Sequence, residues 1–216
     1  MTKQLAMLGL KTLVMVVGPA AVGKSALMHA VCDIDERFAY VRSFTTRPDR
    51  GDGKSTYRHV SEAEAATIKQ TGRTVTFLRH PTTGHAYGTT IESFSGDYNL
   101  LDTLSSSVDA YRNLPFRRTI TISLTTEPDA WQAWLLERYP HASEERTKRL
   151  KEAIESIEWS LRQTDDNRWL VNTPGDLQET ATRLIKLVMN DRTPTATIPS
   201  EAKALLERAK DLLLYQ

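Results

Sequence analysis

Apolar and polar residues alternate along the chain in blocks that predict strands separated by helices. Four short runs have the leucine and β-branched content of buried parallel strands, and they lie at 13–17, 98–102, 119–124 and 169–172. Four longer segments have the spacing or flanking residues of helices, and they lie at about 24–31, 128–138, 144–163 and 177–189. Strands that alternate with helices imply an α/β fold, in which helices cover both faces of a central parallel sheet.

The part of the chain between 37 and 95 departs from this alternation. Its expected elements are a strand, a short helix with a capping box and a second strand, at 38–44, 61–70 and 75–78. We therefore expect a small mixed α/β insertion within a larger core domain. The expected boundaries are 37–95 for the insertion and 11–36 plus 96–190 for the core.

The composition changes again at the C-terminal end. A segment rich in Thr and Pro after 190 predicts a linker, and from Ser200 apolar residues recur at helical spacing. Ser200 is expected to be the N-cap of this amphipathic helix. The apolar face of the helix either docks on the chain's own core or pairs with a second subunit in a homo-oligomer. Residues 191–216 are thus expected to form a linker and a C-terminal helix.

The most informative motif directly follows the first predicted strand. Residues 18–25 read Gly-Pro-Ala-Ala-Val-Gly-Lys-Ser, a full match to the phosphate-binding loop pattern. A strand that enters such a loop and a helix that leaves it direct backbone N–H groups toward an anion. The alternative is a glycine turn with a surface lysine, which does not need these flanking elements.

This motif predicts a binding site for ATP with Mg²⁺. Lys24 is expected to reach the β- and γ-phosphates, and the Ser25 hydroxyl to complete the coordination of the metal ion. The residues expected to contact ATP are Gly18, Ala20, Ala21, Val22, Gly23, Lys24 and Ser25.

Composition and charge favour a single α/β domain and argue against a nucleic-acid-binding, membrane or disulfide-bonded protein. The 216 residues, 40% of them apolar, suffice for one α/β domain with inserted subdomains. A formal net charge of +1 gives no general attraction to nucleic acid or to an anionic membrane. No stretch approaches the ~18 apolar residues of a membrane span. The lone Cys32 excludes an internal disulfide. We expect a cytoplasmic protein that binds small-molecule nucleotides, without nucleic acid or membrane as a partner.

The histidines give no sign of a metal site. Five of them are scattered along the chain without metal-ligand spacing, at positions 29, 59, 80, 85 and 141. We expect all five on the surface or in loops.

Further blocks follow the phosphate-binding loop in a characteristic order. They are Thr-Thr-Arg-Pro-Asp-Arg at 45–50, Tyr-Arg-His-Val-Ser at 57–61 and Gly-His-Ala-Tyr-Gly-Thr at 84–89. With these blocks the chain resembles the guanylate kinase family, and Lys-Arg-Leu at 148–150 and Val-Asn at 171–172 extend the similarity. The resemblance covers roughly residues 11–190. It implies a three-layer fold, an insertion that binds the acceptor nucleotide, a helical lid at 139–147, and transfer of the ATP γ-phosphoryl group to GMP or dGMP.

The resemblance also assigns roles to individual residues. The acceptor phosphate is expected to contact Arg47, Arg50, Tyr57 and Tyr87, since guanidinium and phenol groups donate to phosphate oxygens. The catalytic lid arginines are expected to be Arg138 and Arg149. Asp102 would order Mg²⁺, Asn172 would lie near the donor adenine, and Ser43 and Thr89 would contact the acceptor base. Without the resemblance, the same cations suit a solvated turn or helix surface, and Asn172 suits a strand end.

Three positions depart from the family pattern. Where the family has acidic residues that bind guanine N–H groups, alignment by eye places Leu78 and Leu104. A guanine donor that faces leucine costs about 1–3 kcal/mol. Either a carboxylate such as Glu92 or Asp97 substitutes, or the alignment is shifted, or the acceptor is another nucleotide or a ribose phosphate. The third departure is Trp134, which replaces a lid arginine.

A different class of function also stays open at this stage. Some guanylate-kinase-like domains do not catalyse and instead bind phosphopeptides at the former acceptor site. Those domains typically have a degraded phosphate-binding loop, whereas here its glycines, lysine and serine are intact. The sequence therefore favours the kinase over the binding module.

Overall fold

The computed structural model describes residues 6–49, 51, 56–80, 83–163, 167–190 and 197–215. Arg50, which is predicted to bind the acceptor phosphate, and most of the predicted linker after 190 lie outside the described residues.

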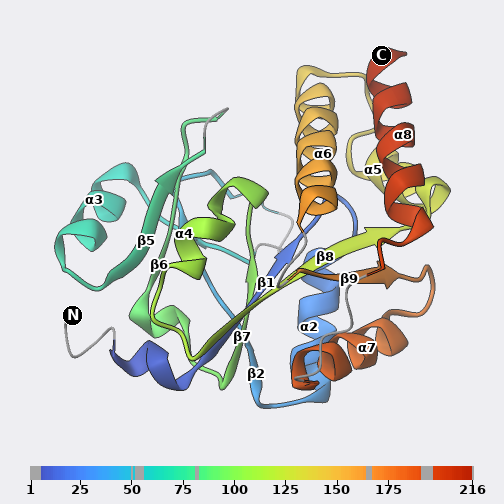
Figure 1. Ribbon diagram of the computed structural model, residues 1–216. Helices are drawn as coiled ribbons and strands as arrows, with labels where there is room; N and C mark the ends of the chain where they lie inside the picture. The colour runs from blue at the N-terminus through green and yellow to red at the C-terminus, as the bar shows by residue number, and fades with distance from the viewer. Residues whose placement is uncertain are drawn as a thin grey trace.

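Five parallel strands form the central sheet (Figure 1). Across the sheet they run in the order β2 (Phe38–Tyr40), β7 (Tyr98–Asp102), β1 (Thr12–Val17), β8 (Arg118–Thr126) and β9 (Asn167–Asn172). The strand predicted at 98–102 has the predicted bounds, and the other three predicted strands begin or end one or two residues further out. The parallel sheet with its surrounding helices confirms the α/β fold.

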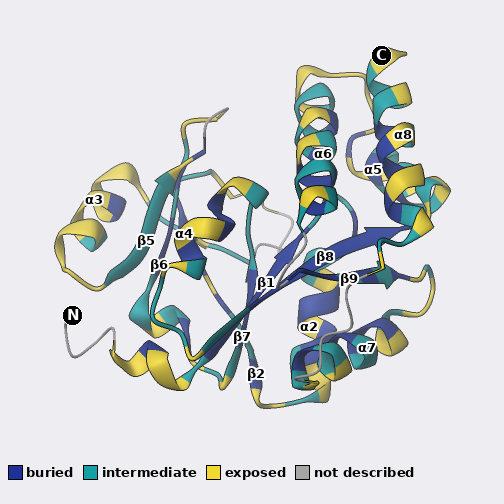
Figure 2. Cartoon of the chain, viewed as in Figure 1, coloured by how far each residue is buried: buried dark blue, intermediate teal, exposed yellow. Residues whose placement is uncertain are grey.

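Alternate residues of the central strands face two separate cores, as the pleat requires. On β1, Val14 and Val16 belong to one core, whereas Leu13, Met15 and Val17 belong to the other. The first core is closed by α2 (Lys24–Ile34), α5 (Pro128–Arg138), α6 (Glu144–Arg162) and α7 (Leu177–Met189). The second is closed by η1 (Met7–Leu10), α4 (Val108–Arg112) and part of α6. Figure 2 shows the buried sheet between helices whose outer faces are exposed.

A second sheet is formed by the chain between β2 and β7. Its strand order is β4 (Arg58–His59), β3 (Phe44–Thr45), β6 (Ala86–Thr90) and β5 (Thr74–Arg79). Helix α3 (Glu62–Gln70) contacts β5 and begins with the predicted capping box between Ser61 and Glu64. This arrangement brings the acceptor-side residues of the insertion to the edge of the central sheet.

The single strand predicted at 38–44 is wrong. β2 pairs with β7 in the central sheet, and β3 pairs with β6 in the second sheet. Residues 41–43 carry the chain from one sheet to the other. The sequence shows no break at this connection, since Val41 and Ser43 are buried there and the strand-like alternation continues through them.

Helix α8 (Ser200–Leu214) lies beside α6 and also contacts α5 and β8 (Figure 1). Its inner face consists of Ala202, Leu205, Leu206 and Ala209, all of them buried. The helix thus docks on its own chain, which was one of the two predicted alternatives. The predicted N-cap is wrong, since Pro199 holds that position and Ser200 is the first helical residue.

Short elements complete the description. The 3₁₀ turn η2 (Ile91–Ser93) precedes β7 in the sequence and η3 (Ser105–Ser107) follows it. η3 contacts α6. In the part of the chain that the structure describes, no helix combines the length and hydrophobicity needed to cross a membrane.

Candidate active site

A cleft of about 1240 Å³ opens at the carboxyl ends of the central strands, where parallel α/β sheets commonly bind ligands. Its central part is lined by residues 18–25 after β1, Asp102 at the end of β7 and Asn172 at the end of β9. The second sheet and the helices contribute the other predicted residues that line it, which are Ser43, Arg47, Tyr57, Tyr87, Arg138 and Arg149. Residues that are distant in sequence therefore meet at one cleft.

The phosphate-binding loop requires glycine at two positions. Gly23 has φ +94°, and a Cβ there would lie 2.5 Å from Asn172 Nδ2. A Cβ at Gly18 would lie 2.6 Å from Leu124 O. The loop leads into α2, which begins at Lys24, so the unpaired N–H groups of the first turn face the cleft. These glycines let the backbone form a close concave site for an anion.

Two side chains hold the loop from outside. Trp131 of α5 is fully buried and its Nε1 donates to Ala20 O at 2.8 Å. Asn172 Nδ2 donates to Val22 O at 3.0 Å. Asn172 therefore supports the loop, and it also lines the cleft in which the donor nucleotide is predicted to bind. Trp131 was not singled out from the sequence, since an indole on an amphipathic helix has the pattern of an ordinary core residue.

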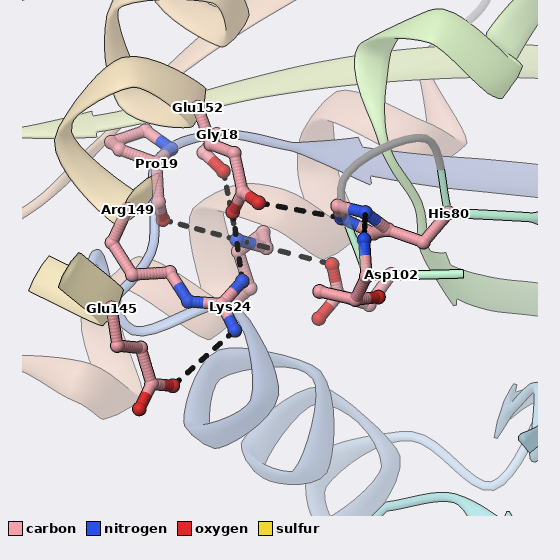
Figure 3. Close-up of polar contacts among 9 residues, drawn as sticks. Gly18, Pro19, Lys24, His80, Asp102, Glu145, Arg149 and Glu152 are labelled. Atoms are coloured by element: carbon pink, nitrogen blue, oxygen red, sulfur yellow. Dashed lines mark hydrogen bonds and ion pairs between the residues drawn. The ribbon is translucent and has the colours of Figure 1, made fainter. Parts of the chain in front are cut away.

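Lys24 lines the cleft, and Figure 3 shows its polar contacts. Its Nζ donates to Gly18 O at 2.8 Å and to Pro19 O at 3.0 Å, and it lies 3.9 Å from Asp102 Oδ1. Burial raises the pKa of the Asp102 carboxyl, and three cations oppose this shift, namely Lys24, Arg138 and Arg47. The predicted donor-side, acceptor-side and lid cations thus act on one carboxylate.

Ser25 and Asp102 have the chemistry of a magnesium site that depends on a nucleotide. Both line the cleft beside the phosphate-binding loop, and the Ser25 hydroxyl is hydrogen-bonded to Tyr40. Among the described residues, no group of three or more His, Cys, Asp or Glu side chains could hold a metal ion. Mg²⁺ commonly binds through one or two protein oxygens together with phosphate oxygens and water. The two side chains fit such a site, with phosphates as the further ligands.

Arg47, Tyr57 and Tyr87 line the same cleft and form a cluster, which we call the acceptor cluster. The rings of Tyr57 and Tyr87 meet edge to face with centroids 5.6 Å apart, and the Arg47 guanidinium lies 5.4 Å from the Tyr57 ring centroid. Burial is the main cause that raises the pKa of Tyr57, so its hydroxyl stays protonated and able to donate.

The Arg47 side chain has an unused donor. Its Nε is buried and has no hydrogen-bond partner among the described residues, an arrangement that suits an anionic ligand. The backbone at Arg47 is held in place, since His59 Nδ1 lies 2.6 Å from Arg47 O. The acceptor cluster is therefore an anchored group of donors in the same cleft as the phosphate-binding loop.

The two predicted lid arginines enter the cleft from the helices. Arg138 is the last residue of α5, and its guanidinium lies 5.9 Å from the Tyr139 ring centroid. Arg149 of α6 donates from Nη1 to Glu152 Oε2 at 2.8 Å, and its Nη2 lies 3.5 Å from Glu145 Oε1 (Figure 3). Trp134 also lines the cleft.

Of the two hydroxyl residues predicted to bind the acceptor base, one lines the cleft and the other does not. Ser43 lines the cleft, whereas Thr89 is fully buried and its Oγ1 lies 2.8 Å from Thr76 Oγ1. Thr76 Oγ1 in turn lies 2.7 Å from the Tyr111 hydroxyl. Thr89 is not among the residues that line the cleft, because its hydroxyl belongs to this buried chain of three. The geometry leaves Ser43 as the hydroxyl of the predicted pair that is available to a ligand.

Leu78 and Leu104 both line the cleft, as their alignment positions predict. The carboxylates suggested as substitutes for acidic base readers do not line it. Glu92 is paired with Arg73 at a half-exposed position, and Asp97 is exposed just before β7 begins, at the opposite end of that strand from Asp102. Neither can replace an acidic side chain at Leu78 or Leu104.

His80 lies in a loop, as expected for the histidines, but its side chain is buried. It follows β5, is only 6% exposed and lines the cleft. Its Nε2 lies 3.3 Å from Glu152 Oε1 (Figure 3). An isolated histidine before a proline gave no sequence signal for this contact, because its partner lies on a helix far along the chain.

Comparison with known proteins supports the fold. No protein-family model and no curated protein sequence matches the chain. Among solved structures, the guanylate kinase from Anaplasma phagocytophilum is similar to it, with a TM-score of 0.52 and 18% sequence identity. The match covers 87% of this chain and 88% of that chain. The chain therefore has a guanylate-kinase-like fold.

Proposed function

We propose that the protein is an ATP-dependent phosphotransferase that transfers the γ-phosphoryl group of ATP to the phosphate of a nucleoside monophosphate. GMP and dGMP are the acceptors that the sequence resemblance implies. The observation that carries the proposal is that two groups with the chemistry to bind phosphate line one cleft and act on one carboxylate. These groups are the phosphate-binding loop and the acceptor cluster, with Asp102 between their cations.

The donor side of the proposal rests on the loop and Lys24. Backbone N–H groups at the start of α2 and the Lys24 ammonium would hold the β- and γ-phosphates. Ser25 and Asp102 would hold Mg²⁺, which neutralises developing charge on the phosphates. Trp131 and Asn172 keep the loop carbonyls engaged, so the loop is already formed before a ligand binds.

The acceptor side uses uncharged and charged donors together. Arg47 and the two tyrosine hydroxyls would bind the acceptor phosphate, and Arg138 and Arg149 would stabilise charge on the transferring group. Such a reaction needs alignment and electrostatic stabilisation more than covalent chemistry. The cleft supplies both functions from residues that it already brings together.

A second acceptor class is favoured by the end of the cleft that would hold a base. Leu78 and Leu104 line it, Thr89 is turned away, and neither Glu92 nor Asp97 reaches it. Each guanine N–H group left without an acceptor costs about 1–3 kcal/mol. The same phosphoryl transfer to another or modified nucleoside monophosphate, or to a ribose phosphate, avoids this cost.

A coupled assay of ADP release tests the donor side. With ATP, Mg²⁺ and an active acceptor, Lys24→Ala should lower turnover by roughly 10²–10³-fold, because it removes one preorganised charge at the phosphates. Lys203→Ala is the matched control, since Lys203 is exposed on α8. Equal turnover in the two variants would contradict the role of the loop lysine.

A panel of acceptors then identifies the substrate. Each ribo- and deoxyribonucleoside monophosphate and a set of ribose phosphates are compared by kcat/KM. Turnover of GMP and dGMP alone would support the first acceptor class and reject the second. Preference for another acceptor would support the second, and Leu78→Glu should then raise GMP turnover relative to that acceptor.

A further inference from the structure

His80 connects the second sheet to helix α6 across the cleft. It lies directly after β5, whereas its partner Glu152 is in the middle of α6. His80 Nε2 is 3.3 Å from Glu152 Oε1, and the two side chains are largely buried, with exposed fractions of 7% and 21%. The ring of His80 also lies 6.2 Å, centroid to centroid, from that of Tyr87 in the acceptor cluster.

One hydrogen bond indicates the tautomer of His80. Thr83 N donates to Nδ1 at 3.4 Å, so Nδ1 is an acceptor and the proton lies on Nε2. Burial lowers the pKa of His80, and the charges of Arg149 and His85 act in the same direction, whereas Glu152 opposes them. A neutral imidazole therefore donates from Nε2 to the Glu152 carboxylate near neutral pH.

Glu152 uses its two oxygens for two different partners. Oε1 faces His80, and Oε2 accepts from Arg149 Nη1 at 2.8 Å. An arginine and a carboxylate left to themselves favour a bidentate pair with two parallel hydrogen bonds. With His80 at the other carboxylate oxygen, Arg149 contacts Glu152 through Nη1 alone, while its Nη2 lies 3.5 Å from Glu145 Oε1.

The contacts with Glu152 and Glu145 engage Nη1 and Nη2 of Arg149 but not its Nε. Its Nε is buried and has no hydrogen-bond partner in the part of the chain that the structure describes. Arg149 lines the cleft, and Figure 3 shows Glu152 between His80 and Arg149. A buried cation with an unpaired donor, in the cleft proposed to bind phosphate, has the chemistry to contact a phosphoryl oxygen.

We propose that His80 is a positioning residue: by holding Oε1 of Glu152, it prevents a bidentate Arg149–Glu152 pair and keeps the Arg149 guanidinium directed at the transferring phosphoryl group. The role of Arg149 in this inference rests on the proposed phosphotransfer function. The contact between His80 and Glu152 also links the sheet that carries the acceptor cluster to the helix that carries the lid arginine.

Kinetics of a double-mutant cycle test this role. His80→Ala should lower kcat by roughly 10- to 100-fold, as expected when a catalytic group is displaced by about 1 Å, with KM for ATP changed less than kcat. His80→Gln retains an N–H donor at the position of Nε2 and should recover most of the loss. In an Arg149→Ala background, His80→Ala should have little further effect, because the group it positions is absent.

Several results would overturn the proposal. Equal losses from His80→Ala with and without Arg149 would show that His80 acts independently of the arginine. Failure of His80→Gln to recover activity would show that the donor to Glu152 is not what matters. An unchanged kcat in His80→Ala would contradict the positioning role directly.

A measurement without turnover separates this proposal from the proposed function. The titration of the His80 ring, followed by NMR in the native protein and in Glu152→Gln, should move to lower pH in the variant, since the carboxylate favours the charged imidazole. The same titration in both proteins would overturn the contact on which the inference rests. Absence of turnover with every acceptor would instead contradict the proposed function.

Discussion

Gly23→Ala is the substitution whose effect the structure defines most fully. Gly23 has φ +94°, where a side chain is strained, and its added Cβ would lie 2.5 Å from Asn172 Nδ2. The Asn172 amide must then move, although it is buried and donates to Val22 O at 3.0 Å. The variant therefore changes the backbone of the phosphate-binding loop and one of the side chains that support it.

The expected size follows from these two effects. A positive φ costs a side-chain-bearing residue about 1–2 kcal/mol. Breaking the Asn172–Val22 hydrogen bond inside the protein costs about 1–3 kcal/mol, because buried polar groups lose their partner. The sum is about 2–5 kcal/mol, and for a domain of this size each kcal/mol lowers the Tm by roughly 2–4 °C.

Thermal and urea unfolding measure this cost, and Gly72→Ala separates its two parts. Gly72 has φ +69° with nothing within 4 Å of its added Cβ, so that variant has the backbone strain without the clash. We expect Gly23→Ala to be the less stable of the two by about 1–3 kcal/mol. It should also lose the rise in Tm that ATP with Mg²⁺ gives the native protein. Equal destabilisation by the two substitutions, with ATP stabilisation retained, would refute the proposed contact between Gly23 and Asn172.

Three further predictions concern stability. Trp131→Phe keeps the buried ring but removes the donor to Ala20 O, and should cost about 1–3 kcal/mol by urea unfolding and weaken ATP binding in a thermal-shift titration. Leu205→Ala should cost about 2–5 kcal/mol by urea unfolding because the side chain is fully buried, whereas Leu214→Ala, 76% exposed at the end of the same helix, should be nearly neutral. Burial lowers the pKa of His80 below its ordinary value of 6.5, so the unfolded chain binds a proton at this residue more readily than the native protein does. As the pH falls below 6.5, the native protein should therefore lose more stability than His80→Gln does. Urea unfolding midpoints measured across pH for the two proteins test this.

Secondary structure was predictable where a local pattern decides it. The helices at 128–138 and 177–189 have the predicted bounds because Pro128 starts the first, Asp176 caps the second and apolar residues recur between their ends. β6 was missed since its sequence, Ala-Tyr-Gly-Thr-Thr, is short and weakly apolar. It forms a strand because β3 and β5 pair with its two edges, and this pairing depends on residues far away in the sequence.

The sequence predicted which residues line the candidate site better than it predicted the directions of their side chains. The sequence motifs correctly predicted that Lys24, Arg47 and Asp102 line one cleft. Lys24 and Asp102 meet there because Asp102 ends one strand and Lys24 follows its parallel neighbour, whereas Arg47 comes from the second sheet. Motifs do not determine which way a side chain points. Thr89 faces Thr76 rather than the cleft, and Asn172 faces the loop backbone. Both orientations result from hydrogen bonds between elements that only the folded chain brings into contact.

The packing of α8 indicates where the cleft can open. α8 is joined to α5 by the contact of Arg208 with Asp129 at 2.7 Å, and its inner face is buried against the core. Helices α5, α6 and α8 and the central sheet therefore form one packed body, and sliding of α8 would expose that face. The second sheet is connected to this body through residues 41–43 and 91–97, so we expect the motion that admits substrate and later excludes water to occur there. That motion would separate His80 from Glu152, which makes the orientation of the lid arginine depend on closure.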